Sequence, residues 1–144
     1  SLRGHLETLA DGLEPGRVNF LGKKAPKEIS EILRASDIFV LFSKFENHPI
    51  ALKEAIACGC YPIAADVGRV RKILSISKTG TLVPPNNQQQ LERALATVIS
   101  EHRYSSFSPE NAVTDEPSVN SWMGNAKCIV DWDLLNEQQL VGKV

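Results

Sequence analysis

Short apolar runs alternate with segments of helical periodicity along most of this chain, and this alternation constrains the fold more than any other feature. The clearest apolar run is Asp37–Phe42, which reads DIFVLF. Because it is nearly all apolar, we expect both of its faces to be covered, as in a parallel sheet between helices. Strands and helices that alternate with short connections form parallel strands joined by right-handed crossovers. The sequence therefore predicts an α/β fold with a parallel sheet flanked by helices.

Further elements follow from the same periodicity. Three more strands are expected, at residues 18–21, 61–65 and 80–83. Helices are expected to begin near Leu2, Pro26, Pro49, Arg69 and Asn87. The first helix places four leucines on one face: Leu2, Leu6, Leu9 and Leu13. Ligands of such sheets bind outside the carboxyl ends of the strands, so function is expected in the loops after Leu21, Phe42, Ala65 and Val83.

The last third of the chain differs in composition. We expect a folded domain over residues 1–103, an irregular linker over 104–118, rich in Ser, Pro and Asn, and a C-terminal helical tail over 119–144. The apolar positions of this tail are Trp122, Ala126, Ile129 and Trp132. The sequence does not say whether the tail packs on this domain or on another one.

Composition excludes few classes of protein. A net charge of −1 favours neither nucleic acid nor an anionic membrane surface as a partner. No apolar run approaches the roughly 20 residues that span a bilayer, and the N-terminus lacks a signal-peptide pattern. The three cysteines (Cys58, Cys60 and Cys128) are interpreted as small core residues, and we expect a cytoplasmic location.

Glu54 is the first residue that suggests chemistry. On the predicted helix its neighbours at three and four residues are Ile50, Ala51, Ala57 and Cys58, which are all apolar. A carboxylate on an apolar face costs free energy unless it has a hydrogen-bonding partner. A pair of sugar or ribose hydroxyls would be such a partner, and so would a backbone group or an arginine.

Glu46 lies in the loop between the 37–42 strand and this helix. The N-terminus of the helix offers free N–H groups and a positive dipole end, which suit phosphate oxygens. Together these groups would form one nucleotide-sugar pocket. The alternative for Glu46 is a solvated loop charge, and taken alone two glutamates eight residues apart are a weak signal.

The run from Val18 to about Ser100 resembles the C-terminal domain of GT-B glycosyltransferases of retaining family 4, the glycosyl transferases group 1. Five motifs carry the resemblance: Val18–Gly22, Ala35–Val40, Ser43–Glu54 with its two glutamates, Glu54–Gly59 and Gly80–Pro85. The resemblance implies a Rossmann-like domain over residues 1–103, incomplete at its N-terminus, that binds a nucleotide-diphosphate sugar. It also implies a retaining hexosyltransferase that needs no bound metal or other cofactor.

Residue roles follow from the resemblance. Glu46 is expected to contact the transferred sugar as a catalytic or stabilising carboxylate, Glu54 to hold the ribose hydroxyls, and Lys23 to contact the base. Four intervening residues are expected to face the diphosphate and the sugar: Asn47, His48, Pro49 and Ile50.

Two departures from the family's pattern concern the site. Pro49 cannot donate an N–H, so one phosphate donor is lost unless Ile50 or Ala51 supplies it; His48 stands where relatives have an aromatic residue and is interpreted as a pocket wall. The family's Gly-Gly-x-Pro-Glu becomes a basic stretch, residues 68–72, reading GRVRK. This stretch is either a solvated helix face or a contact for an anionic acceptor or lipid headgroup.

The third departure concerns what the chain lacks. The family's C-terminal domain begins with two further strands and a pair of basic residues that clamp the diphosphate, and an N-terminal acceptor domain precedes it. We therefore expect a fragment, a split subunit or a degenerate descendant that is inactive alone and needs an acceptor-binding domain or subunit. Membrane association at the inner face, through an acceptor lipid, is left open. The alternative is a non-catalytic interaction module with the same fold; a receiver-like domain would need an acidic cluster that the sequence lacks.

Overall fold

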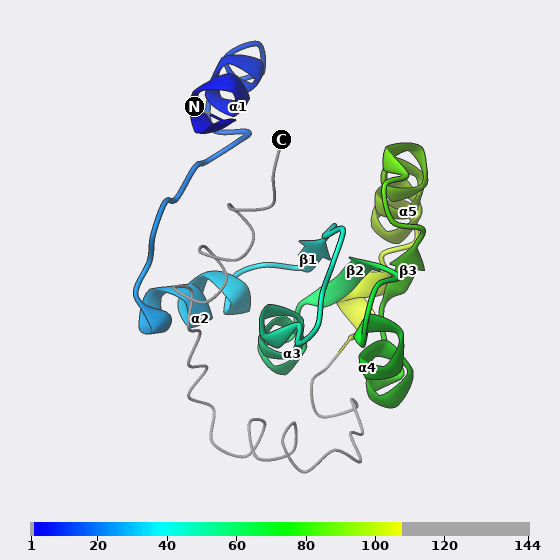
Figure 1. Ribbon diagram of the computed structural model, residues 1–144. Coiled ribbons are helices and arrows are strands. Elements are labelled where there is room, and N and C mark those ends of the chain that lie inside the picture. The colour runs from blue at the N-terminus through cyan, green and yellow to red at the C-terminus, as the bar shows by residue number, and fades with distance from the viewer. Residues whose placement is uncertain (1, 108–144) are drawn as a thin grey trace.

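The computed structural model describes residues 2–107 (Figure 1). The predicted helical tail and Cys128 lie outside these residues. The elements in chain order are α1 (Leu2–Ala10), α2 (Pro26–Arg34), β1 (Ile38–Leu41), α3 (Ile50–Ala57), β2 (Tyr61–Ala65), α4 (Val70–Ser77), β3 (Thr81–Val83), α5 (Gln88–Ser100) and the 3-10 helix η1 (Arg103–Ser106). Strands and helices alternate from α2 to α5, as the periodicity predicts.

The three strands form one parallel sheet in the order β1-β2-β3. Val40 of β1 lies beside Ile63 of β2, and Ala65 of β2 lies beside Val83 of β3. All five residues of β2 are buried, as expected for a central strand covered on both faces. The predicted fold class, a parallel sheet flanked by helices, is confirmed.

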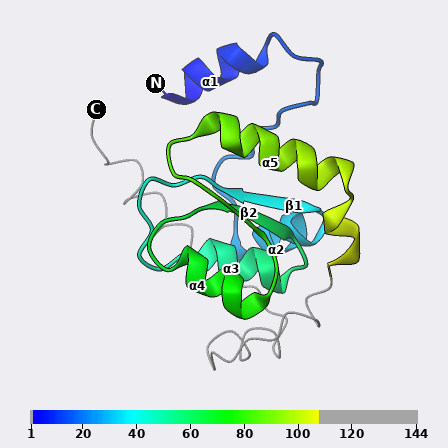
Figure 2. The same ribbon diagram turned by 90° about the vertical axis from the view of Figure 1, so that its right-hand side faces the viewer.

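Helices cover the two faces of the sheet in a three-layer arrangement. Figure 2 shows α5 on one face and α3 and α4 on the other. On the α3/α4 face, Leu52, Ile56 and Val70 pack around Ala64 of β2. On the α5 face, Val98 packs with the alternate β2 residue Ile63 and its neighbours. The core is therefore centred on β2, and β1 lies at one edge of the sheet.

Local sequence signals set the helix ends near the site. Pro26 occupies the first turn of α2, where its missing N–H costs nothing. The side chain of Asn87 accepts a hydrogen bond from the backbone N–H of Gln90 (3.0 Å), which caps α5 at the residue where this helix is predicted to begin. The last turn of α3 closes with the N–H of Cys60 on the carbonyl of Ala55 (2.9 Å). This Schellman closure requires the positive φ of +94° at Gly59.

The predicted strand at residues 18–21 is wrong. These residues join α1 to α2 without strand structure, and Val18, Phe20 and Leu21 are 44%, 38% and 51% exposed. A strand needs a neighbour for its backbone hydrogen bonds, and within residues 2–107 no strand lies beside this segment. The apolar pattern indicates a preference for strand structure, but within residues 2–107 there is no neighbouring strand with which this segment could pair.

The expectation that both faces of β1 are covered holds only in part. Ile38 of β1 and Phe42 just after it pack against the core on the α5 face, whereas Val40 between them is 40% exposed. Helix α1 does not complete the cover of this face: in both views α1 lies outside the α/β body (Figures 1 and 2). The leucine face of α1 stays open, with Leu6 and Leu9 43% and 62% exposed.

The start of the predicted linker packs on the domain. Tyr104 and Phe107 contact the core on the α5 face, and η1 includes residues 103–106. The division into domain, linker and tail otherwise stays a prediction. Cys60 is a buried core residue whose thiol donates to the carbonyl of Leu33 (3.0 Å). In the described part of the chain, every helix is too short or too polar to cross a membrane.

Candidate functional site

The loops after the three strands meet at the carboxyl edge of the sheet. Residues 42–49 follow β1, residues 66–69 follow β2 and residues 84–87 follow β3. Parallel strands end at the same edge, which is where α/β proteins bind ligands. Glu46 lies in the first of these loops, and α3, which carries Glu54, starts at its end. The candidate site is built on this edge.

Glu54 is completely buried. Its side chain has 0% exposure, and within residues 2–107 neither carboxylate oxygen has a hydrogen-bond partner. The backbone and arginine partners that the sequence left open are therefore not used. An unpaired buried carboxylate is costly, and such a group in a native fold calls for a ligand or another explanation.

Burial also changes the acidity of both glutamates. Desolvation raises the pKa of Glu54 from 4.5 to about 8, because the protein interior disfavours the charged form. The pKa of Glu46, which is half-buried in its loop, is raised for the same reason. Glu54 is thus largely a neutral acid at pH 7, able to both donate and accept a hydrogen bond.

The N-terminus of α3 refines the expectation about phosphate donors. Pro49 is its buried N-cap and has no N–H to give. The N–H of Ile50 donates to the carbonyl of His48 (2.7 Å), so it is already engaged. The first amide that closes a helical turn belongs to Lys53, which donates to Pro49 (3.3 Å). Ala51 is therefore the better of the two substitutes for the lost donor.

The remaining predicted site residues are exposed, and they lie on two different segments of the chain. Asn47 and His48 are exposed on the same loop as Glu46. Lys23 is exposed in the segment between α1 and α2, next to Gly22, whose backbone faces Arg3 of α1. The structure thus brings Glu46, Asn47, His48, Pro49 and Ile50 together on one loop leading into the helix of Glu54, whereas the part of Lys23 in the site stays a prediction.

The loop after β2 contributes contacts that the sequence did not reveal. Arg71 pairs with Asp66 through two hydrogen bonds, one of them 3.1 Å from Nε to Oδ1. Arg71, in the first turn of α4, is therefore paired with the aspartate of this loop. Gly68, between them, lies directly against the backbone of Glu46. The sequence shows the spacing of this aspartate, glycine and arginine. That spacing does not reveal that the loop after β2 contacts the loop after β1.

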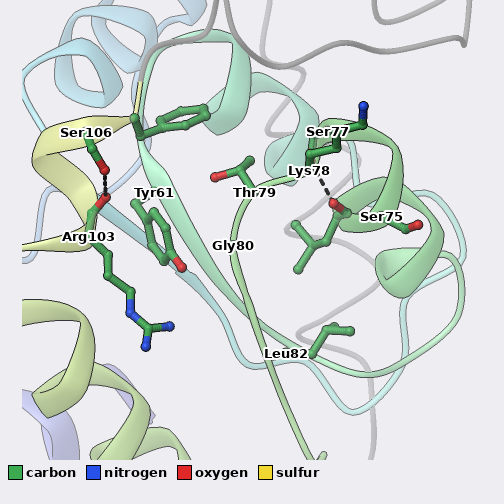
Figure 3. Close-up of a pocket in the computed structure, with 11 residues that line it drawn as sticks. Tyr61, Ser75, Ser77, Lys78, Thr79, Gly80, Leu82, Arg103 and Ser106 are labelled. Carbon is green, nitrogen blue, oxygen red and sulfur yellow. Dashed lines mark hydrogen bonds between the residues drawn. The ribbon is translucent and has the colours of Figure 1, made fainter. Parts of the chain in front are cut away.

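A separate cavity of about 580 Å³ lies at the opposite end of the sheet. It is lined where the strands begin, by Tyr61 and Gly80 among others, and by Lys78 and Arg103. Figure 3 shows Tyr61 between Arg103 and Thr79 in this hollow. It does not include the glutamates, so it is not part of the candidate site.

The fold is that of a part of a GT-B glycosyltransferase. A family model, "Glycosyl transferases group 1", matches residues 3–112. Sucrose-phosphate synthase from Thermosynechococcus elongatus superposes with a TM-score of 0.61 at 25% identity, covering 96% of this chain and 33% of that one. The chain belongs to the glycosyl transferases group 1 family, and its fold is confirmed as that of a GT-B enzyme's α/β domain.

Two curated relatives match a smaller share of this chain than the solved structure does. D-inositol 3-phosphate glycosyltransferase of Rhodococcus opacus (strain B4) is 35% identical over 85 residues, which are 59% of this chain and 19% of that protein. GDP-mannose-dependent alpha-mannosyltransferase of Mycobacterium tuberculosis (strain CDC 1551 / Oshkosh) is 28% identical over 106 residues, 68% of this chain and 28% of the other. The chain therefore spans between 19% and 33% of the length of these similar proteins.

Proposed function

We propose that this chain is the donor-binding part of a retaining family 4 glycosyltransferase and takes a nucleotide-diphosphate sugar. One observation carries the proposal: the Glu54 carboxyl is buried with both oxygens unpaired, on the helix that leads away from the Glu46 loop. Ribose hydroxyls are partners of the right chemistry and would remove the cost of that burial.

Each residue has a proposed part in the reaction. Glu46 stabilises the positive charge that develops at the anomeric carbon when its bond to the diphosphate breaks. The diphosphate leaves with the bonding electron pair, and an acceptor hydroxyl adds to the same carbon with retained configuration and gives its proton to the departing diphosphate oxygen. The amide of Ala51 at the start of α3 meets a phosphate oxygen. Lys23 contacts the base, and no metal takes part.

Access to Glu54 sets a condition on binding. Because its side chain has no exposed surface, a ribose can meet it only when the residues that cover it shift. We propose that donor binding drives this shift, since the ligand would satisfy two oxygens that are otherwise unpaired.

Exposed apolar residues favour the binding of a partner domain or subunit. Val40 on β1 is exposed, and within residues 2–107 no strand pairs with the outer edge of β1. Val18, Phe20 and Leu21 in the segment between α1 and α2 are exposed as well. Exposed apolar surface next to an unpaired strand edge is typical of a protein interface. We propose that an acceptor-binding domain or subunit, together with further strands of this sheet, packs there. A cytoplasmic site, with contact to the membrane through a lipid acceptor, is part of the proposal.

Calorimetry tests donor binding. We expect UDP or GDP, and more tightly one of their sugars, to bind the chain. The Glu54→Leu variant should lose about 1–3 kcal/mol of nucleotide affinity, because the ribose hydroxyls would then be buried without their hydrogen-bond partner. Glu31→Leu, a change at an exposed glutamate of α2, serves as the matched control and should bind as the wild type does.

A second expectation concerns turnover in an assembled enzyme that contains this chain. Glu46→Ala should lower kcat strongly while nucleotide affinity changes little, because Glu46 faces the sugar and not the ribose. Equal turnover in Glu46→Ala and wild type would refute the role of Glu46.

One observation favours an alternative function. Complete burial of Glu54 suits a non-catalytic module in which the donor pocket has closed and only the interface is used. This alternative predicts that UDP, GDP and their sugars all fail to bind, even when an acceptor domain is supplied, whereas a partner protein still binds at the β1 edge.

A further inference from the structure

Two loops from neighbouring strands touch at the candidate site. Because β1 and β2 pair in parallel, the loop that holds Glu46 and the loop of residues 66–69 leave the sheet side by side. Their contact is made by Gly68. A Cβ atom placed on Gly68 would lie 1.7 Å from the carbonyl oxygen of Glu46, 2.9 Å from its carbonyl carbon and 3.8 Å from the amide nitrogen of Asn47. Gly68 therefore packs directly on the peptide unit that joins Glu46 to Asn47.

The contact, and not the backbone conformation, demands glycine at this position. Gly68 has a φ of +52°, in the left-handed region. Three other residues of this chain hold almost the same φ with full side chains: Lys78 at +50°, Asn86 at +55° and His102 at +51°. A side chain is thus compatible with this conformation at a modest cost. At Gly68 it is excluded because the backbone of Glu46 occupies the space.

The loop that carries Gly68 is fixed at several points. The N–H of Asp66 donates to the carbonyl of Val83 (2.9 Å), which continues the sheet. The N–H of Val70 donates to the carbonyl of Val67 (3.1 Å), and Val70 is completely buried in the core. The bidentate pair between Arg71 and Asp66 spans the turn. The turn is therefore anchored to the core, and the peptide unit after Glu46 rests on it.

We propose that Gly68, on the turn clamped by Asp66 and Arg71, is a positioning residue that sets the peptide unit between Glu46 and Asn47 and so aims Glu46 at the donor sugar. The inference rests on the proposed donor function. It assigns Gly68 no contact with the ligand: Gly68 acts through Glu46. It also gives Arg71 a structural role, because its pair with Asp66 holds the turn that carries Gly68.

The test compares Gly68→Ala with Gly16→Ala in the full chain. Gly16 has a φ of +84°, and no atom lies within 4 Å of the position that a Cβ would take, so its alanine variant is strained without a close contact. The first measurement is the affinity ratio of nucleotide sugar to nucleoside diphosphate, using UDP-glucose with UDP and GDP-mannose with GDP. We expect Gly68→Ala to reduce the ratio on the order of tenfold and the nucleoside diphosphate affinity by less than about twofold. Gly16→Ala should leave both unchanged.

A second measurement needs no ligand. The titration of the Glu46 carboxyl, followed by ¹³C NMR, reports its surroundings, because partial burial raises its pKa from 4.5. Alanine at position 68 must push the loop away, so the midpoint should move back toward 4.5 in Gly68→Ala and stay in place in Gly16→Ala. A purely structural role would lower the melting temperature of both variants without separating them in these two measurements.

The outcomes separate the two proposals. If the wild type binds no nucleotide sugar, the donor function fails, and the Glu46 titration alone decides the role of Gly68. An unchanged titration in Gly68→Ala overturns that role. If Gly68→Ala does not fold, Arg71→Met replaces it, since this exposed side chain can be removed without a steric clash. Arg71→Met should shift the titration in the same direction, and a wild-type curve would overturn the inference.

Discussion

At the scale of single residues, the buried carboxyl of Glu54 makes the stability of the fold depend on pH. Its buried carboxyl has a pKa of about 8 in the folded state, against an ordinary value of 4.5. Between these values the folded protein keeps a proton that the unfolded chain releases. Linkage then requires the free energy of unfolding to fall as pH rises from about 4.5 to about 8. The stabilising contribution is complete at low pH and is lost at high pH.

Glu54→Gln tests this linkage. The amide cannot ionise, so the variant should be more stable than the wild type at pH 8, by an amount on the order of a few kcal/mol. At about pH 5 the two proteins should differ little, because the folded wild type then holds its proton. Urea denaturation at both pH values measures the effect, with Glu31→Gln as the exposed control. A wild-type pH dependence in Glu54→Gln would show that another group is responsible.

The residue scale also shows the limit of sequence reasoning. The apolar neighbours of Glu54 along its helix predict burial, and the structure confirms it. The absence of a partner within residues 2–107 could not be predicted, because a partner can come from any element that packs on the helix. The contact between Gly68 and Glu46 depends in the same way on two loops far apart in the sequence.

At the scale of elements, caps and pairing decide which predictions hold. The start of α5 at Asn87 could be predicted because the residue that Asn87 caps, Gln90, lies only three positions further along the chain. The strand predicted at residues 18–21 failed because apolar alternation says nothing about whether a neighbouring strand is available. Local signals were therefore reliable for helix ends, whereas strand formation depends on pairing that the local sequence does not contain.

Asn87→Ala should lower the free energy of unfolding by about 1 kcal/mol, since the N–H of Gln90 loses its acceptor at the start of α5. Asn87→Asp keeps an acceptor and should remain near the wild type. Chemical denaturation of the three proteins at one pH measures the difference. Equal stability of the alanine variant and the wild type would mean that the cap is replaced by water.

At the scale of the whole molecule, the α/β body and α1 differ in what they contribute. The core is built around β2 between α5 on one face and α3 and α4 on the other, and α1 lies outside it. The sequence predicted the parallel sheet correctly, because it follows from the order of elements. It did not predict the exposure of Val40 on β1, because residue periodicity does not show how far a helix reaches across a sheet.

Two leucines distinguish the body from α1. Leu52 is completely buried, and Leu52→Ala should cost about 2–5 kcal/mol. Leu9 is 62% exposed, so Leu9→Ser should change stability by less than about 0.5 kcal/mol. The stabilities of the two variants and the wild type are compared by thermal and urea unfolding. A large loss in Leu9→Ser would show that α1 packs on the body in solution.

The donor half-site is tested most directly by the Glu54 carboxyl itself. A ¹³C NMR titration of this group is recorded without ligand and with saturating UDP or GDP. Ribose hydroxyls that donate to the carboxylate favour its charged form, so the pKa should fall from about 8 when the nucleotide binds. A titration of Glu54 that stays the same with every nucleotide, also in the presence of an acceptor-binding partner, would contradict the proposed donor site.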